Sequence, residues 1–275
     1  MGKHVRQRRT HRQMIGVAGC GRMGGPMLEA LRDGGARAIG FDVVEKNAPY
    51  IAQNLMAFAP DLDTLFSVVR DADETDALLF GTQNLIKTAP KLTRIFICST
   101  LSPRYVRDLR TRIPAHITLI DAPMSGAQVA AENRTLSFML GGDQSDIDDA
   151  IPLLAMMGQY FHHMGAYGAG MQAKVLNNLL AASHTAMTRL VLDWADTAGL
   201  ATDKLLALIA TSSGQNWLAS GFDTIEFARD GHAADNTIGI LVKDVAAALD
   251  SAPKGADLAL PETVQAAIRA LKPRV

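Results

Sequence analysis

The stretch IGVAGCGRMGGPM, residues 15–27, decides the fold of this chain. Residues 14–18 are mostly apolar and predict a buried strand, and Gly19, Gly21 and Gly24 follow with the spacing G-x-G-x-x-G. In a strand–turn–helix unit the first glycine permits the tight turn and the second lets the backbone approach a pyrophosphate. The third glycine lets the helix pack on the strand. The stretch therefore predicts a dinucleotide-binding turn.

The residues after this turn support the same interpretation. An amphipathic run that begins at Pro26 predicts a helix, whose N-terminal N–H groups would bind the phosphates. Residues 38–41 predict a second strand, and Asp42 follows it at about the separation where a carboxylate binds the ribose hydroxyls. This order of strand, turn, helix, strand and acid favours a dinucleotide site over an unrelated glycine-rich turn.

Composition limits the class of protein. The chain has 275 residues, of which 48% are hydrophobic and 20% charged, and its net charge is −1. This balance argues against a nucleic-acid-binding surface over the whole protein, and no apolar run approaches the roughly 20 residues that span a membrane. The two cysteines, Cys20 and Cys98, are expected to be buried free thiols in a reducing cytoplasm. We expect no metal site, because neither cysteine has metal-ligand spacing with a histidine.

Strand-like and helix-like segments alternate after residue 14, which predicts a doubly wound parallel sheet. The predicted strands are 14–18, 38–41, 64–69, 94–98, 117–120, 136–140 and 158–163. The predicted helices are 26–33, 48–57, 73–80, 103–113 and 145–155.

The strand pattern ends near residue 170, and only helical segments follow. The longest predicted helix, 171–198, contains no proline or glycine and stops at Gly199. Further helices are predicted over 202–211, 214–228, 237–250 and 261–271. We therefore expect an α/β fold: an N-terminal Rossmann domain over 14–166, then an all-α domain over 167–275 that the long helix joins to it. The basic residues 1–13 are expected to be a disordered tail.

Two segments at predicted strand ends carry polar groups. Ligands of open α/β sheets bind beyond the carboxyl ends of the strands. Thr100 follows the strand 94–98 and is the better candidate there for a cofactor contact, since Ser102 is expected to cap the next helix. Ser125 and Gly126 follow the strand 117–120 and could bind a carboxylate through hydroxyl and N–H groups.

The start of the long helix carries a second pair. Lys174 and Asn178 are four residues apart, so they share one helix face, and apolar neighbours surround the lysine. A lysine in such a setting can act as a general acid or base, and Asn178 could donate a hydrogen bond to the substrate.

Together these segments resemble the β-hydroxyacid dehydrogenase family, which includes 3-hydroxyisobutyrate dehydrogenases, tartronate semialdehyde reductases and glyoxylate/succinic semialdehyde reductases. The family motifs G-x-G-x-M-G-x-P-M, S-T-x-x-P, D-A-P-V-S-G-G, G-x-x-x-K-x-x-N-N and K-D-L are similar, in that order, to residues 19–27, 99–103, 121–126, 170–178 and 243–244. The resemblance covers about residues 14 to 250.

The resemblance implies a role for each matching residue. Lys174 would be the catalytic lysine, and Ser125, Gly126, Ala127 and Asn178 would bind the substrate carboxylate. The cofactor would contact Gly19, Cys20, Gly21, Arg22, Met23, Gly24, Asp42, Val69, Arg70, Thr100 and Lys243. Asp244 would lie near the same cleft.

The chain departs from the family pattern at three places, one of them a pair of residues. Ala127 stands where the family has a second glycine, and Val69-Arg70 replaces a Leu-Pro pair near the cofactor. Asn236 replaces a phenylalanine, which predicts a more polar substrate pocket.

The sequence thus predicts a cytoplasmic, NAD-dependent oxidoreductase that acts on a small carboxylate-bearing β-hydroxy acid or its semialdehyde. Asp42 favours NAD over NADP, because it would repel a 2′-phosphate. We expect a homodimer or homotetramer that binds neither nucleic acid nor a membrane. Two alternatives stay open: an imine reductase-like enzyme, which Lys174 disfavours, and a non-catalytic NAD-binding scaffold, which the Lys174–Asn178 pair disfavours.

Overall fold

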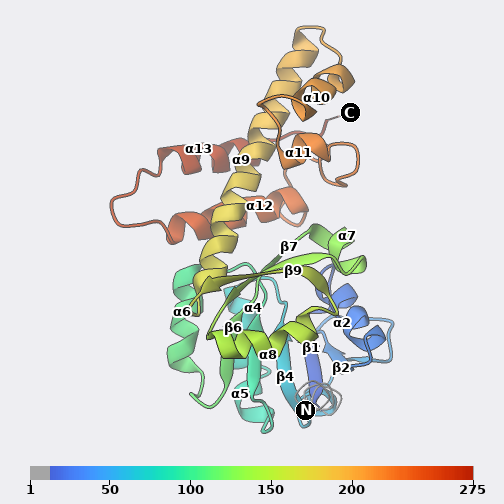
Figure 1. Cartoon of the computed structure of the whole chain (residues 1–275), viewed down its shortest axis with the longest axis vertical. Coiled ribbons are helices and arrows are strands. Elements are labelled where there is room, and N and C mark those ends of the chain that lie inside the picture. Colours follow the sequence, from blue (N-terminus) through green and yellow to red (C-terminus); the bar gives the residue numbers. More distant parts are fainter. Residues whose placement is uncertain (1–12, 275) are drawn as a thin grey trace. The chain divides into compact units, whose positions relative to one another are not determined.

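The structure, a computed structural model, describes residues 13–274 (Figure 1). The predicted tail over 1–13 lies outside the described residues apart from Gln13. The chain divides after Lys174 into two compact units.

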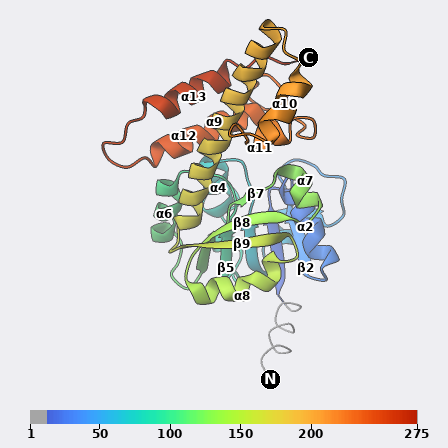
Figure 2. The ribbon, with the colours of Figure 1, turned by 45° about the horizontal axis from the view of Figure 1, so that its top comes forward.

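The first unit is built on a sheet of nine strands in the order β3-β2-β1-β4-β5-β6-β8-β7. Strand β9 lies beside β8 (Figure 2). The strands are β1 (Met14–Ala18), β2 (Arg37–Phe41), β3 (Ile51–Ala52), β4 (Leu62–Ser67), β5 (Arg94–Ile97), β6 (Thr118–Asp121), β7 (Met124–Ser125), β8 (Leu136–Gly141) and β9 (Gly158–Gly165).

The predicted parallel Rossmann sheet is confirmed from β3 to β6, where every neighbouring pair is parallel. Beyond β6 the sheet becomes mixed, because β8 runs antiparallel to both β6 and β7. Only residues 126–135 connect β7 to β8, whereas a parallel crossover needs about a dozen residues or more. The chain therefore returns antiparallel, and β9 then adds in parallel to β8.

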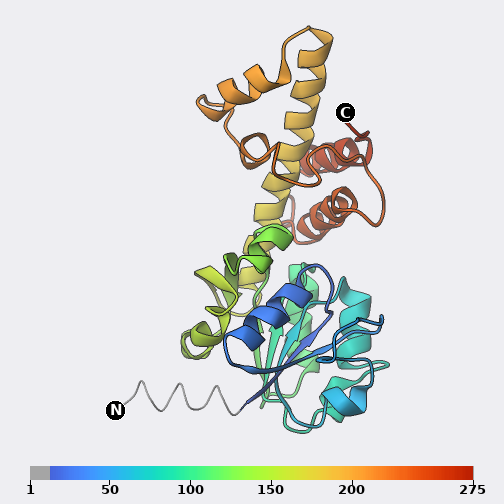
Figure 3. The same cartoon turned by 90° about the vertical axis from the view of Figure 1, so that its right-hand side faces the viewer.

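Helices cover both faces of the sheet (Figure 3). One face packs against α2 (Gly24–Asp33), α7 (Ala127–Glu132) and α8 (Gln144–Leu154), and the other against α3 (Leu55–Phe58), α4 (Ala72–Leu79), α5 (Leu85–Thr88) and α6 (Pro103–Arg112). Neighbouring strand residues point to opposite faces, so Val17 belongs to one core and Ala18 to the other. Burial of both faces explains the near-continuous apolar strands of the sequence.

The helix predicted over 48–57 is wrong except at residues 55–57, which lie in α3. Ile51 and Ala52 instead form the edge strand β3 and pair with Gly40 and Phe41. Asn54 then caps the short α3 by accepting a hydrogen bond from the Met56 N–H at 2.9 Å. Pairing with β2 therefore overrides the local helical pattern in this segment.

The second unit is helical. After the long helix α9 (Ala169–Thr197) it contains α10 (Thr202–Ala210), α11 (Trp217–Ser220), α12 (Thr237–Asp250) and α13 (Ala259–Arg269). The helix predicted over 214–228 is wrong outside α11, which Asn216 caps by accepting a hydrogen bond from the Ala219 N–H and which ends at Ser220, before Gly221.

A buried arginine holds the second unit together. The Arg189 guanidinium, 1% exposed, donates hydrogen bonds to the carbonyls of Ala228 at 2.9 Å, Asp230 at 2.7 Å and Lys272 at 2.5 Å. Burial lowers the pKa of this guanidinium. Arg189 therefore fastens two segments far apart in the sequence to the middle of α9.

Candidate active site

The predicted site residues of the first unit follow the carboxyl ends of its parallel strands. The glycine turn follows β1, Asp42 follows β2, Val69 and Arg70 follow β4, and Thr100 follows β5. Because these strands are parallel, their carboxyl ends lie at one edge of the sheet, which is where open α/β sheets bind ligands.

The glycine turn has the geometry of a dinucleotide site. Gly19 has a φ of +90°, which suits glycine. A Cβ at Gly24 would lie 1.9 Å from the Gly19 carbonyl oxygen, so only glycine lets α2 approach the turn. Gly21 differs, because its φ is not positive and an added Cβ would meet nothing within 4 Å. No contact among the described residues requires glycine there, and the open space fits a group that approaches the backbone from outside.

The N-terminus of α2 suits an anion. Its first turn contains no acidic residue and receives no hydrogen bond from a capping side chain. The N–H groups of a first helical turn carry partial positive charge and bind phosphate. The turn and the helix together therefore fit the pyrophosphate of a dinucleotide.

Asp42 lies against this turn. Its carboxylate accepts hydrogen bonds from the N–H groups of Cys20 and Val44, both at 2.9 Å, and Lys46 is an ion-pair partner at 3.8 Å. A carboxylate oxygen accepts more than one hydrogen bond, so Asp42 retains the capacity to bind ribose hydroxyls. Burial, together with the Asp42 charge, raises the pKa of the Cys20 thiol to about 12, so this cysteine stays protonated in the turn.

The segments after β4 and β5 are joined to each other. The Ser99 hydroxyl donates a hydrogen bond to the Val69 carbonyl at 2.5 Å, which places the loop containing Thr100 beside the loop containing Arg70. The Arg70 side chain is bonded to Glu74 in α4, and this contact raises its pKa. Arg70 is therefore a surface group tied to the start of α4.

The predicted substrate loop contains an unusual backbone conformation. Ser125 ends β7, and Gly126 has a φ of +130°. Ala127, which follows, has a φ of +55°, in the left-handed region that favours glycine. The departure from the family pattern at Ala127 thus falls where a side chain is conformationally unfavourable.

Lys174 lies in the second turn of α9 and is 8% exposed. The preceding turn is held by Asp121, whose carboxylate accepts hydrogen bonds from the N–H groups of Gly168 at 2.7 Å and Met171 at 2.5 Å. Burial raises the pKa of Asp121, and the two hydrogen bonds oppose that rise. Asp121 ends β6, so the start of α9 is fixed at the same edge of the sheet as the glycine turn.

Asn178 and Lys243 belong to the second unit. The Asn178 side-chain amide donates a hydrogen bond to the Asp244 carboxylate at 2.6 Å, and both residues are buried. Lys243 precedes Asp244 in α12. Asp244 therefore orients the amide of Asn178, one turn along α9 from Lys174.

Sequence reasoning did not assign these roles to Asp121 and Asp244. Both residues stood inside recognised motifs, and Asp121 directly followed the predicted strand 117–120. Their partners are 47 to 66 residues away, so no local pattern could identify those hydrogen bonds.

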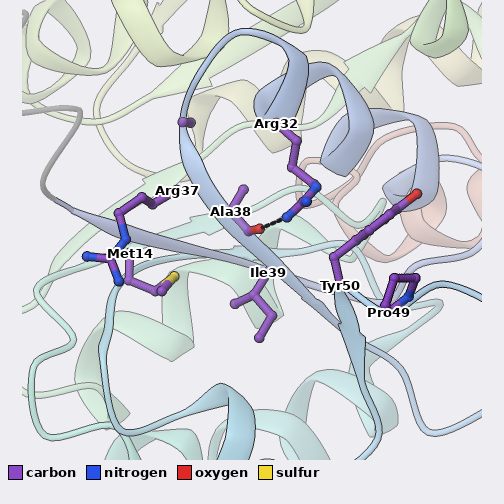
Figure 4. A pocket seen from close by; sticks show the side chains of 8 residues that line it. Met14, Arg32, Arg37, Ala38, Ile39, Pro49 and Tyr50 are labelled. Carbon is purple, nitrogen blue, oxygen red and sulfur yellow. Dashed lines mark hydrogen bonds between the residues drawn. The ribbon is translucent and has the colours of Figure 1, made fainter.

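A pocket of about 530 Å³ lies elsewhere, at the amino ends of β1 and β2 (Figure 4). Met14 and Arg37, the first residues of these strands, line it together with Arg32 and Tyr50. The Arg32 guanidinium lies 4.3 Å from the centre of the Tyr50 ring and donates a hydrogen bond to the Ala38 carbonyl at 2.8 Å. This pocket is therefore at the opposite edge of the sheet from the glycine turn.

Residues 13–274 contain neither a helix that could span a membrane nor a metal-ligand cluster. None of the described helices is long and apolar enough to cross a bilayer. Within the same range, no group of three or more histidine, cysteine or acidic residues is placed to hold a metal ion.

The Rossmann sheet and the glycine turn have the form of a dinucleotide-binding domain. The profile of the NAD binding domain of 6-phosphogluconate dehydrogenase matches residues 14–165. The profile described as NAD-binding of NADP-dependent 3-hydroxyisobutyrate dehydrogenase matches residues 168–274. The chain belongs to the β-hydroxyacid dehydrogenase family, whose members are NAD(P)-dependent dehydrogenases of hydroxy acids.

Individual relatives agree with this assignment. The 3-hydroxyisobutyrate dehydrogenase of Pseudomonas aeruginosa is 30% identical over 253 residues, which are 86% of this chain and 85% of that protein. The solved structure of Mycobacterium tuberculosis 3-hydroxyisobutyrate dehydrogenase with L-serine is 24% identical. It has a TM-score of 0.75 over 94% of this chain and 96% of that chain. An imine reductase from Myxococcus stipitatus with NAD⁺ shares the fold at 15% identity, with a TM-score of 0.62 over 94% and 93% of the two chains.

Proposed function

We propose that this protein oxidises a small β-hydroxy acid, or reduces the corresponding semialdehyde, with Lys174 as the proton-transfer group and NAD as the preferred cofactor. The observation that carries the proposal is the position of Lys174. It is a buried lysine on a helix whose first turn is bonded to the carboxyl end of β6, at the sheet edge that carries the glycine turn.

Each residue of the proposed site has its own role in the reaction. Bound NAD supplies the hydride acceptor at its nicotinamide ring. The neutral Lys174 amine accepts the hydroxyl proton as the carbinol carbon loses its hydride, and in reduction the ammonium returns that proton. Ser125 and the Gly126 N–H bind the substrate carboxylate, and the amide of Asn178, oriented by Asp244, donates a hydrogen bond to the substrate.

The glycine turn supports the choice of a dinucleotide, and Asp42 supports NAD. The proposed contacts along the cofactor are the turn from Gly19 to Gly24, then Val69, Arg70, Thr100 and Lys243. The proposed domain boundary lies near residue 166, ahead of α9. The buried free thiols of Cys20 and Cys98 support a reducing compartment, and we place the enzyme in the cytoplasm.

The experiment is a panel of β-hydroxy acids and semialdehydes with NAD and NADP, followed by the absorbance of the reduced nicotinamide. Lys174→Ala is expected to lower kcat by about 10²–10⁴-fold, the usual contribution of a general acid–base group. Lys174→Arg is expected to be similarly poor, because a guanidinium stays protonated. NADH affinity should stay near that of the wild type, and Lys87→Ala, at an exposed lysine in α5, is the control.

Near-wild-type turnover by Lys174→Ala would show that this lysine is not the proton-transfer group. NADH binding by the wild-type protein without turnover of any substrate in the panel would instead favour a non-catalytic scaffold.

The second unit supports a homo-oligomer, either a dimer or a tetramer. Leu180, Met187, Leu190 and Trp194 are exposed on α9, at spacings of seven, three and four residues. These spacings place all four on one helix face, and residues 175–188 contain no charged side chain. An exposed apolar helix face of this kind is typical of a contact between subunits.

Sedimentation of the wild type is expected to give a dimer or tetramer. Met187→Glu is expected to shift it towards the monomer, with Asp203→Lys at the start of α10 as a charge-changing control. A monomeric wild-type protein would contradict the proposed oligomer.

A further inference from the structure

The carboxylate of Asp121 makes two long-range hydrogen bonds to the start of α9. Oδ1 accepts the Gly168 N–H at 2.7 Å and Oδ2 accepts the Met171 N–H at 2.5 Å. The first turn of a helix leaves N–H groups without partners inside the helix, and the first turn of α9 contains no acidic residue. A side chain from β6 therefore caps this helix, in place of a residue next to it in sequence.

The surroundings leave the carboxylate little room to move. Asp121 is fully buried, and a Cβ at Gly141 in β8 would lie 2.1 Å from its Oδ1. A Cβ at Gly170 in α9 would lie 2.3 Å from the Met139 carbonyl oxygen of β8. The two glycines thus let β8 close on the carboxylate and on the helix. A buried carboxylate is tolerated only with hydrogen-bond partners, and Gly168, just before α9, and Met171, in its first turn, supply two of them.

Met171 joins the same turn to a second loop. Its sulfur accepts a hydrogen bond from the Leu101 N–H at 3.4 Å, and Leu101 follows Thr100, a proposed cofactor contact. Met171 is fully buried. The first turn of α9 is therefore bonded both to the end of β6 and to the loop after β5.

Lys174 is three residues beyond Met171, which is slightly less than one helical turn. We propose that Asp121 is a positioning residue for the reaction: by holding the first turn of α9, it sets the place of Lys174 relative to the cofactor loop at Thr100. This role rests on the proposed function of Lys174. Asp121 itself does not need to touch the substrate.

Asp121→Asn tests the role with little change in shape. An asparagine side chain has a single acceptor oxygen, so one of the two N–H groups must face an NH₂ group. Displacement of a catalytic group by about 1 Å can lower the rate by 10²-fold. We expect kcat, counted per NADH-binding site, to fall by about 10- to 100-fold, while the dissociation constant of NADH and the substrate KM change less than about threefold.

Asp63→Asn is the matched control. Asp63 also accepts a backbone N–H from a distant strand, that of Met14 at 2.7 Å, but it does so at the amino end of β4. If Asp121 only stabilised the fold, Asp121→Asn would behave like Asp63→Asn. Both substitutions would then lower the melting temperature and the number of NADH-binding sites, and neither would lower kcat per site. A kcat per site within twofold of the wild type in folded Asp121→Asn would overturn the proposal.

Two further measurements keep the test decisive. If Asp121→Asn does not fold, Met171→Leu keeps the apolar volume and removes the sulfur acceptor of the Leu101 N–H. It should lower kcat by at least about threefold, and an unchanged kcat would refute the positioning role. Amide hydrogen exchange over residues 168–174 should be faster in Asp121→Asn than in Asp63→Asn. This readout needs no turnover, so failure of the proposed dehydrogenase activity and failure of the positioning role are distinguishable.

Discussion

Replacing Ala127 with glycine is expected to stabilise the protein. Ala127 has a φ of +55°, its side chain is exposed, and it follows Gly126 in the proposed substrate loop. A left-handed conformation costs an L-residue with a Cβ roughly 1–2 kcal/mol. Glycine removes this cost, and no buried contact is lost because the methyl group faces solvent.

Glycine also increases the conformational freedom of the unfolded chain, which offsets the gain by about 0.4–1 kcal/mol. The net effect of Ala127→Gly is therefore a stabilisation of about 0.5–1 kcal/mol. For a chain of this size, that corresponds to a rise in melting temperature of about 1–4 °C.

Thermal unfolding followed by circular dichroism measures this effect. The control is Ala130→Gly, at a helical position of α7 whose φ is not positive. There glycine should destabilise the protein by about 1 kcal/mol. The two variants make the same chemical change and are expected to have opposite signs. A melting temperature of Ala127→Gly at or below that of the wild type would refute the backbone argument.

Four more substitutions test other parts of the structure. Gly21→Ala should leave the melting temperature unchanged, because an added Cβ meets only open space, and should weaken NADH binding at least about tenfold, because that space would hold the pyrophosphate. Gly24→Ala should instead destabilise the apoprotein by about 1–3 kcal/mol through its clash with the turn. An NADH affinity of Gly21→Ala equal to that of the wild type would argue against pyrophosphate binding at this turn. Because Asp42 would repel the 2′-phosphate of NADP, the wild type should have a higher kcat/KM with NAD than with NADP, and Asp42→Ala should reduce the ratio of the two values. A wild-type preference for NADP would contradict the assignment of Asp42 to the ribose hydroxyls. Arg189→Met should lower the free energy of unfolding, measured by urea titration, by about 3 kcal/mol, since three carbonyl groups lose a charged donor. A loss below about 1 kcal/mol would show that the buried guanidinium contributes little to stability.

The outcome at individual residues shows which features depend on local sequence. The glycine turn, the strand before it and Asp42 could be predicted because the requirements for a tight turn and a close helix are local and restrict residue type strongly. The long helix α9 was predicted to within two residues at each end, since residues 171–198 contain no glycine or proline and Gly199 follows them. The predictions for segments 48–57 and 214–228 were wrong outside α3 and α11, because residues 51–52 pair with an edge of the sheet and the helix that starts at Trp217 ends before Gly221.

The sequence by itself determined the Rossmann architecture, the identity of the glycine turn and the family, through motifs in which each residue type is required by nearby backbone geometry. Only the tertiary structure decided that β8 runs antiparallel, that Ala127 is left-handed, that Asp121 holds the start of α9 and that Asp244 orients Asn178. The partners of Asp121 and Asp244 are 47 to 66 residues away in the sequence. Such pairs form only when the strands and helices have packed, so no local periodicity or spacing encodes them.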